Sequence, residues 1–442
     1  MKGISGSTNK NSWQYWANIH KNYCPHGIAY FLAWHRGYIS YFEQQLRVVL
    51  GYDKLDSAKL MLPYWDYYTY PTLPEDFTNA ASNNPLYTRR VNTSAYPALS
   101  MSPFATGVNN FQLGLNNAFE PNLESAPHDP VHDIIGGYLA DITTAALDPI
   151  FYLHHCNLDR LWNAWSRRST SKVPAATSSY WNGTFTYASN LTMARALTRT
   201  TAGLLYDYAD DTMPVKMPQQ AQHGRIVRVQ AQNSSIHGRP KLRTFTSSAP
   251  RTVSSTRDSL GGLVGIPLDN NSISAGITLQ TAGANSLRDV LATSPAAVLS
   301  DSASSAADLQ PQAQSPTPSQ GSGEAKKSFQ HVKLVLDGLR SASTAGQDGG
   351  YFYNIYLNLP STGDVDSVSA SHFVGTVGAF EVSVAAHHGN GKKEFDITYP
   401  LASLGLTNPN QMVVSFVREN GLVYPSGNVV SMNEMRLELS TD

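Results

Sequence analysis

Apolar residues recur at helical spacing through the first half of this chain of 442 residues. In segments 12–20 and 28–50 they stand three and four positions apart, which predicts two helices. A third helix is expected from Pro130 to Gly136 and a fourth from Pro149 to Trp165, where Pro149 suits a first turn. Four helices that face one another predict an α-helical, four-helix-bundle domain with long loops.

The last third of the chain follows a period of two instead. Segments such as 331–339, 351–359, 372–384 and 411–417 alternate apolar and polar residues, and turn residues separate them. Short strands at this spacing predict an all-β sandwich or a barrel-like domain.

The stretch between these regions, from about 212 to 327, is rich in Ser, Ala, Thr, Pro and Gln, which is typical of a linker. Some of its segments, such as 225–230 and 273–280, have the pattern of strands. We therefore expect a helical domain in residues 1–211, a partly flexible linker in 212–327 and a β-rich domain in 328–442.

Charge and composition exclude several classes of partner. A net charge of -1 gives no attraction to nucleic acid or to an anionic membrane, and no apolar run is long enough to cross a bilayer. The first residues lack the apolar core of a secretory signal. Both cysteines, Cys24 and Cys156, lie in histidine-rich segments where a disulfide would compete with metal binding, so we expect a cytoplasmic location.

Histidines gather in two clusters of the helical region and are the main functional signal. The first cluster contains His20, His26 and His35, and the second contains His128, His132 and the adjacent pair His154 and His155. Histidines four residues apart share one face of a helix and can reach the same metal ion, which a histidine from the fourth helix can complete. The two clusters therefore predict two metal ions, each held by three imidazoles.

Imidazole ligands favour copper or zinc, and copper binds such sites more tightly. A zinc-protease helix would carry Glu directly after its first histidine, whereas Asp129 follows His128 here. Copper is therefore the expected metal.

Long motifs around these histidines resemble the tyrosinase and polyphenol oxidase family of type-3 copper proteins. The matching segments are 17–24, 26–36, 127–132 and 148–162, and the Tyr-Asp-Tyr sequence at 206–208 resembles the end of the family's catalytic domain. The resemblance implies a dinuclear copper centre that binds dioxygen. It implies that His20, His26 and His35 hold the first copper and that His128, His132 and His155 hold the second.

In the family pattern the second histidine of the adjacent pair is the ligand, so His154 is expected to face elsewhere as a structural residue. Asp159 lies one turn after His155 and can hydrogen-bond the other ring nitrogen of a metal ligand. The alternative for Asp159 is a surface charge on the helix.

Cys24 stands two residues before His26. In fungal and molluscan relatives a cysteine at this place forms a thioether with the histidine ring, and the resemblance implies the same bond here. The alternative is a free buried thiol, which is a common state of cysteine.

Glu124 precedes His128 by four residues. In plant relatives a glutamate at this place holds a water near the copper ions, and a polar residue, usually Asn in enzymes that hydroxylate monophenols, follows the first ligand of the second copper. Here that residue is Asp129. The two carboxylates can hold a water that acts as a base, or can raise each other's pKa and weaken it. Asp129 can also be a charge favoured by a helix N-terminus.

The leading hypothesis is a phenol oxidase that hydroxylates monophenols ortho, oxidises o-diphenols to o-quinones, or does both. Segment 140–147 contains no aromatic residue, whereas some catechol oxidases shield the first copper there with Phe. Small phenolic compounds are the expected substrates, with dioxygen as co-substrate, and a homo-oligomer is compatible with the sequence.

Segments 349–360, 372–384 and 393–401 resemble, more weakly, a C-terminal domain found in plant-type and some bacterial members. In the family this domain sits over the copper cleft and inserts a side chain. We therefore expect the intact chain to be latent, and cleavage within about 212–327 to activate it. The His387–His388 and Lys392–Lys393 pairs are expected to be solvated loop residues, and Cys156 a core residue.

Two kinds of alternative stay open. An o-aminophenol oxidase, or a catechol oxidase without monophenolase activity, would use the same copper site. A hemocyanin-like oxygen carrier, from another class, shares the fold and the Cys-x-His feature, although a single copy of the domain argues against it.

Overall fold

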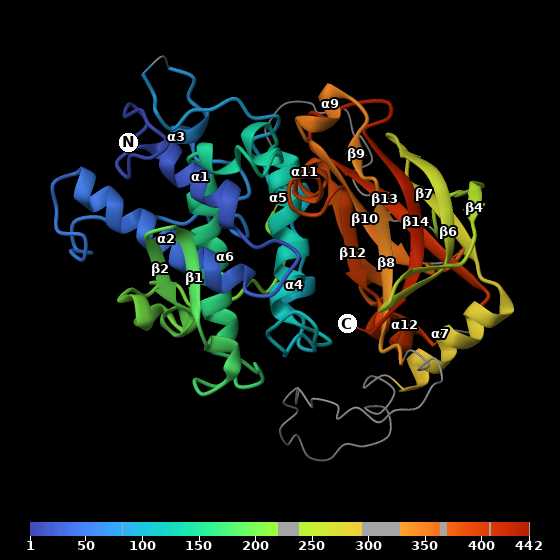
Figure 1. The fold of residues 1–442 in the computed structure, drawn as a ribbon. Helices are drawn as coiled ribbons and strands as arrows, with labels where there is room; N and C mark the ends of the chain where they lie inside the picture. Colours follow the sequence, from blue (N-terminus) through green and yellow to red (C-terminus); the bar gives the residue numbers. More distant parts are fainter. Residues whose placement is uncertain (82, 220–237, 294–327, 363–368, 406–407, 442) are drawn as a thin grey trace.

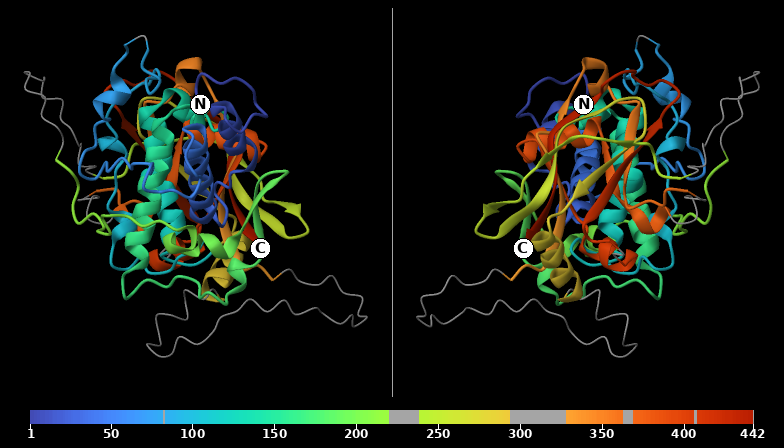
Figure 2. Two further views of the ribbon diagram at one scale, coloured as in Figure 1. Left: turned by 90° about the vertical axis from the view of Figure 1, so that its left-hand side faces the viewer. Right: turned by 90° about the vertical axis from the view of Figure 1, so that its right-hand side faces the viewer.

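The computed structural model describes residues 1–81, 83–219, 238–293, 328–362, 369–405 and 408–441. A helical half and a β-rich half lie against each other (Figure 1). In Figure 2 the side of the helical half faces the viewer in the left view, and the side of the β-rich half faces the viewer in the right view. No described helix has the length and apolar character needed to span a bilayer.

The helical half contains the expected helices. They are α1 (Trp13–Tyr23), α2 (Phe31–Val49), α5 (Asp129–Ile135) and α6 (Ile150–Ser166), with the short α3 (Glu75–Thr78) and α4 (Phe119–Leu123) in the loops. Helix α2 packs against α6, and a turn of π-helix, Glu124–His128, leads from α4 into α5. The division into a helical and a β-rich region is confirmed, whereas the regular four-helix bundle stays a prediction.

Local sequence explains where these helices begin and end. Ser12 caps α1 by accepting a hydrogen bond from the backbone N–H of Gln14. Helix α5 ends at Gly136, whose φ of 67° few other residues adopt. Tyr30, at the start of α2, has a φ of 77° and makes no side-chain cap, so another part of the molecule must bind the free N–H groups there.

The β-rich half is a sandwich of two sheets. One sheet has the strand order β11-β10-β13-β7-β3, and the other has the order β12-β8-β14-β6-β4, with β5 beside β6 and β9 beside β14. Apolar residues of both sheets, such as Ile277 and Leu437, are fully buried in one core. The strands are β3 (Leu242–Arg243), β4 (Thr246–Ser248), β5 (Arg251–Ser254), β6 (Arg257–Leu268), β7 (Ile273–Thr278), β8 (His331–Asp337), β9 (Arg340–Ser341), β10 (Tyr351–Leu357), β11 (Phe373–Gly378), β12 (Lys392–Asp396), β13 (Gln411–Asn420) and β14 (Val430–Ser440).

The limits of this half differ from the expected ones. Strands β3 to β7 and helix α7 (Thr281–Thr293) come from the stretch expected to be a linker. Strand β6 pairs with β14, and β7 pairs with β13, so both lie inside the sandwich. Segment 273–280 does contain a strand, as its pattern indicated, whereas segment 225–230 lies outside the described residues. The Ser- and Gly-rich composition concealed strands whose buried faces are apolar.

A helix takes the place of one expected strand. Residues 372–384 were expected to be extended throughout, but β11 ends at Gly378 and α11 (Ala379–His388) follows. Glu381 accepts a hydrogen bond from the backbone N–H of Gly378 at 2.8 Å, which fixes the first turn of this helix. Short helices also occur at Thr344–Gln347 (α9), Ser369–His372 (α10) and Thr398–Leu404 (α12).

Helix α11 lies between the two halves, beside α5 (Figure 1). The backbone N–H of Phe380 donates to Oδ1 of Asp133 at 2.8 Å, and Asn92 exchanges two hydrogen bonds with the backbone of Val423 at 2.9 and 2.8 Å. A Cβ at Gly378 would lie 2.1 Å from the Asp133 carboxylate, so the close approach of the two halves requires glycine there. These contacts fix the β-rich half against the face of the helical half that carries the histidines.

Candidate metal centre

The predicted histidines of both clusters meet in the interior of the helical half. Helix α1 supplies His20, the following loop supplies His26, α2 supplies His35, the π-turn supplies His128, α5 supplies His132 and α6 supplies His155. The ring nitrogens of all six are buried. The sequence therefore predicted six residues, from His20 to His155, that are far apart in the chain and share one site.

The six rings form two adjoining triangles. In the first, the ring centroids of His20, His26 and His35 lie 5.4 to 5.6 Å apart. In the second, those of His128, His132 and His155 lie 4.6 to 5.9 Å apart. The rings of His35 and His155 stack at 4.4 Å and so bring the triangles together. Ligand atoms of His128, His132 and His155 lie within 4.8 Å of one another, and so do those of His20, His35 and His155.

Hydrogen bonds orient three of these rings. The Nδ1–H groups of His35 and His132 donate to the carbonyl oxygens of Phe31 and Leu139, each at 2.8 Å. That of His128 donates to Oδ1 of Asp129, also at 2.8 Å. Because Nδ1 carries the proton, Nε2 is left with its lone pair, and the Nε2 atoms of all three have no hydrogen-bond partner. Buried nitrogens without partners are rare, and a metal ion would satisfy them.

Burial also keeps the imidazoles in the neutral form that metal ions require. It lowers the pKa of His35 to about 3 and that of His132 to about 4. Burial likewise lowers the pKa of His20, with neighbouring histidines adding to the effect. The residues present therefore fit metal ions in chemistry as well as in arrangement.

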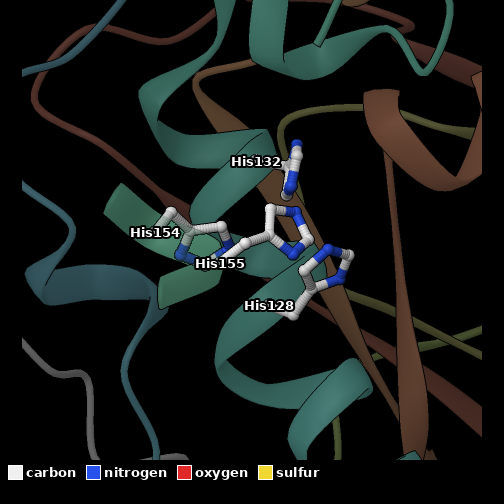
Figure 3. A group of neighbouring side chains, drawn as sticks. All are labelled: His128, His132, His154 and His155. Carbon is white, nitrogen blue, oxygen red and sulfur yellow. The ribbon is translucent and has the colours of Figure 1, made fainter. Parts of the chain in front are cut away.

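His154 does not face away from the site, and the prediction that it would is wrong. Ligand atoms of His128, His132, His154 and His155 all lie within 4.8 Å of one another, and Figure 3 shows the four side chains together. The His154 ring stacks on that of His128 at 5.4 Å, and neither of its nitrogens has a partner. Helix α6 is buried around its whole circumference here, so successive residues can both reach the second triangle.

Cys24 lies beside the first triangle. Its sulfur falls within 4.8 Å of ligand atoms of His20 and His26, and the side chain is buried. Burial raises the pKa of this thiol well above its usual range. Cys156 is also buried and free, as expected of a core residue. The placement is compatible with both the thioether and the free thiol.

The two predicted carboxylates lie at the edge of the site. Oε1 of Glu124 accepts a hydrogen bond from the backbone N–H of Gly27 at 2.7 Å, and Asp129 accepts from His128. Burial raises the pKa of Glu124 to about 7, although Lys393 opposes that shift. Burial raises the pKa of Asp129 as well. Glu124 can thus gain or lose a proton near neutral pH.

Lys393 is not a solvated residue, so that expectation is wrong. Its Nζ lies 3.8 Å from Oδ2 of Asp129, and only 17% of its side chain is exposed. Burial alone would lower the pKa of Lys393, but the surrounding carboxylates, Asp129 foremost, raise it. The register of β12 points Lys393 toward the helical half, which the local sequence could not reveal.

Asp159 contacts none of the site histidines. It binds Nε of Arg36 at 2.5 Å and accepts hydrogen bonds from the hydroxyls of Tyr206 and Tyr208. Arg36 in turn lies 3.5 Å from the centroid of the Trp162 ring. Both sequence interpretations of Asp159 are therefore wrong: it is a buried anchor that joins α2, α6 and the Tyr-Asp-Tyr segment.

Sequence reasoning missed Glu120 and Phe380. Oε1 of Glu120 accepts a hydrogen bond from the backbone N–H of Leu32 at 3.2 Å, which supplies the missing cap of α2. The only sequence signal for Glu120 was its position four residues before Glu124. Phe380, from α11, stacks on His132 with ring centroids 4.1 Å apart and lies 5.5 Å from His26. Because a strand was expected here instead of a helix, the sequence did not indicate that Phe380 contacts the histidines.

Comparison with known proteins identifies this type of site. A family model described as the common central domain of tyrosinase matches residues 10–100 and 72–168. A tyrosinase of Hahella is 31% identical over 185 residues, covering 35% of this chain and 40% of the relative. Polyphenol oxidase A1 of Vicia faba is 25% identical over 318 residues, covering 57% and 51%. Hemocyanin 1 of Megathura crenulata is 29% identical over 175 residues, covering 35% and 5%.

Among solved structures, latent apple tyrosinase aligns over 99% of this chain and 92% of its own, with 17% identity and a TM-score of 0.48. The chain spans about 40% of the Hahella relative and less of the hemocyanin. The buried histidine triangles lie within the region that the family model matches. Residues 10–168 of this chain therefore match the central domain of the tyrosinase family of copper proteins, and the relatives of that region include tyrosinases, polyphenol oxidases and hemocyanins.

Proposed function

We propose that this chain is a type-3 copper phenol oxidase that hydroxylates monophenols ortho, oxidises o-diphenols to o-quinones, or does both. The observation that carries the proposal is the pair of adjoining histidine triangles with buried, unpartnered Nε2 atoms. We propose that His20, His26 and His35 hold one copper ion and that His128, His132 and His155 hold the other. Copper bound there would supply the activation of dioxygen.

The protein's own groups orient substrate and move protons. Glu124, with a pKa of about 7, can take the phenolic proton directly or through a water, because general bases work best near the ambient pH. Asp129 holds Nδ1 of His128 and so fixes that ring. Phe31 and Phe151 pack against the histidine rings, with centroids 4.6 Å from His128 and 4.2 Å from His155, and keep water from the far side of the site.

We further propose the thioether between Cys24 and His26. The bond would join Sγ to a ring carbon, with the two hydrogens passing to dioxygen as the oxidant. A covalent bond would fix the orientation of His26, which lies in a loop and is the one site histidine with no hydrogen bond or helix to hold it.

The proposed latency follows from the position of α11. The Phe380 ring lies over rings of both triangles, 4.1 Å from His132 and 5.5 Å from His26, where a phenol would have to bind. The β-rich half would therefore act as a tethered cap at high effective concentration. Because β3 already belongs to this half, a cut that frees the whole cap must fall between about 212 and 241.

The decisive experiment measures copper content and then turnover. Purified chain is loaded with copper and assayed with tyrosine, a catechol and an o-aminophenol, before and after limited proteolysis. The proposal requires copper binding near two ions per chain and turnover of at least one phenol after cleavage. Copper binding with turnover of o-aminophenol alone would assign the o-aminophenol oxidase instead.

An oxygen carrier is the second candidate. A hemocyanin aligns with the same region. The Phe380 ring lies where a phenol would bind, but a ligand as small as dioxygen would have to displace less of that ring. Reversible oxygenation without turnover of any phenol, in the cleaved chain as well, would favour this function. We propose small phenols as substrates and a cytoplasmic location on the sequence grounds given above.

A further inference from the structure

Two exposed histidines end the helix that carries Phe380. His387 and His388 stand in the last turn of α11, with ring centroids 4.6 Å apart. Neither belongs to the buried triangles. Nε2 of His387 lies 2.8 Å from the carbonyl oxygen of Lys21, the residue after His20. The pair was expected to be solvated, and it is exposed, but His387 is also bound to the helical half at the rim of the metal centre.

The contact with Lys21 determines which nitrogen of His387 is free. A carbonyl oxygen only accepts hydrogen bonds, so Nε2 must carry a proton, and in the neutral ring Nδ1 then keeps the lone pair. Metal-binding histidines commonly donate the second ring nitrogen to a backbone carbonyl in this way. His387 is therefore oriented as a metal ligand would be, with its free nitrogen available.

The second imidazole belongs to the same turn of α11. The ring centroids of His387 and His388 lie 4.6 Å apart. Burial lowers the pKa of His388, which favours the neutral form that a metal ligand needs. The hydrogen bond of His387 to Lys21, the neighbour of His20, places this pair at the edge of the first triangle.

We propose that His387 and His388 form an entry site at which a monovalent copper ion binds before it passes to the first histidine triangle. The inference rests on the proposed copper function. Two neutral imidazoles suit a monovalent copper ion, which accepts few ligands, and the transfer is an exchange of imidazole ligands with no change of oxidation state. Since α11 covers the buried triangles with Phe380, copper that arrives while the cap is closed needs a binding site at the edge of that cover.

The test follows the rate of copper uptake in the full-length chain. Metal-stripped protein is mixed with Cu(I) under anaerobic conditions, free copper is quenched with a chelator at intervals, and bound copper is counted. The double variant His387→Gln/His388→Gln is compared with the native chain and with His331→Gln. His331 is a matched control, because it is another partly exposed histidine of the cap, paired with Asp396 and remote from the rim.

We expect the double variant to load roughly tenfold more slowly than the native chain and the control, within the range seen when groups that support metal ligands are removed. The final copper content should be the same in all three. Equal loading rates would overturn the inference and leave the proposed function intact, whereas a native chain that binds no copper would overturn both.

A second variant guards against a folding defect. His388→Gln alone keeps the hydrogen bond from His387 to Lys21, so the cap contact stays in place while one ligand is lost. Slow loading in this variant, with a circular dichroism spectrum like that of the native chain, supports the entry site. If the double variant takes up copper slowly but His388→Gln takes it up at the native rate, the pair acts on cap closure and the entry site is refuted.

Discussion

The ring of Phe380 stacks on the ring of His132 at a centroid distance of 4.1 Å and an interplanar angle of 24°. The backbone N–H of Phe380 also donates to Asp133, the residue next to His132. One residue of the β-rich half is thus fixed to the candidate metal centre through both its backbone and its side chain.

Phe380→Ala should raise the activity of the intact chain toward that of the cleaved chain. The substitution removes the ring that lies where we propose that the phenol binds, but leaves the backbone contact to Asp133, so the cap should stay docked. We expect an increase of about tenfold in kcat/KM, which corresponds to roughly 1.4 kcal/mol of activation free energy. Phe373→Ala, in β11 away from the histidines, is the control, and equal activity in both variants would refute the role of Phe380.

Lys393→Met should loosen the cap. The change leaves Asp129 buried without its cation, and a buried charge that loses its partner destabilises the arrangement that buries it. We expect the intact variant to reach full activity at a lower detergent concentration than the native chain. Lys392→Met is the matched control, because Lys392 pairs with Glu394 on the cap itself. The cleaved forms of both variants should behave alike.

The Cys24 thioether can be measured by mass. After copper loading in air, the native chain and Cys156→Ala should each lose the mass of two hydrogens in the peptide that contains Cys24 and His26. Cys24→Ala should show no such loss and should bind the first copper more weakly. A native peptide that keeps its full mass and a thiol that reacts with alkylating agents after unfolding would leave Cys24 a free thiol.

Glu124→Gln should remove a pH dependence near neutrality. The pKa of Glu124 is raised to about 7, so its base form appears only as pH rises through that value, and monophenol turnover should rise with it. The variant should lose this rise of turnover with pH. Glu120→Gln is a buried control: its side chain caps α2 through an oxygen that Gln retains, so this variant should keep the rise of turnover with pH.

Glu120→Gln should be no less stable than the native chain at neutral pH. Burial raises the pKa of Glu120 to about 8, so its carboxyl is mostly neutral there, and the side-chain oxygen that accepts from Leu32 is retained in Gln. Chemical denaturation of the two metal-stripped chains tests this expectation.

The histidines of the metal centre could be predicted from the sequence, whereas the residues of the β-rich half that contact them could not. The spacing of His128 and His132, and the long motifs around His20 and His155, carry local information on helix faces and so identified the residues that converge. The prediction for His154 was wrong because helical periodicity gives the direction of a side chain around the axis of α6, but does not show what surrounds that helix. Phe380 and Lys393 act across the boundary between the halves, and no local pattern encodes which residue meets a partner from another domain.

The strands showed a similar limit. Composition assigned β6 to a linker, because Gly261, Gly262 and Gly265 weaken its period of two. Its true place depends on pairing with β14, at the other end of the domain. The interpretations of Asp159 were wrong for the same reason, since its partners Arg36 and Tyr206 lie far away in sequence.

The position of β14 has a consequence for synthesis of the chain. This strand lies between β6 and β8 and pairs with both, so the larger sheet remains in two pieces until β14 has been synthesised. Segments that are synthesised first can fold first. The helical half precedes the cap in the sequence, so it passes through a period without its cover during every round of translation.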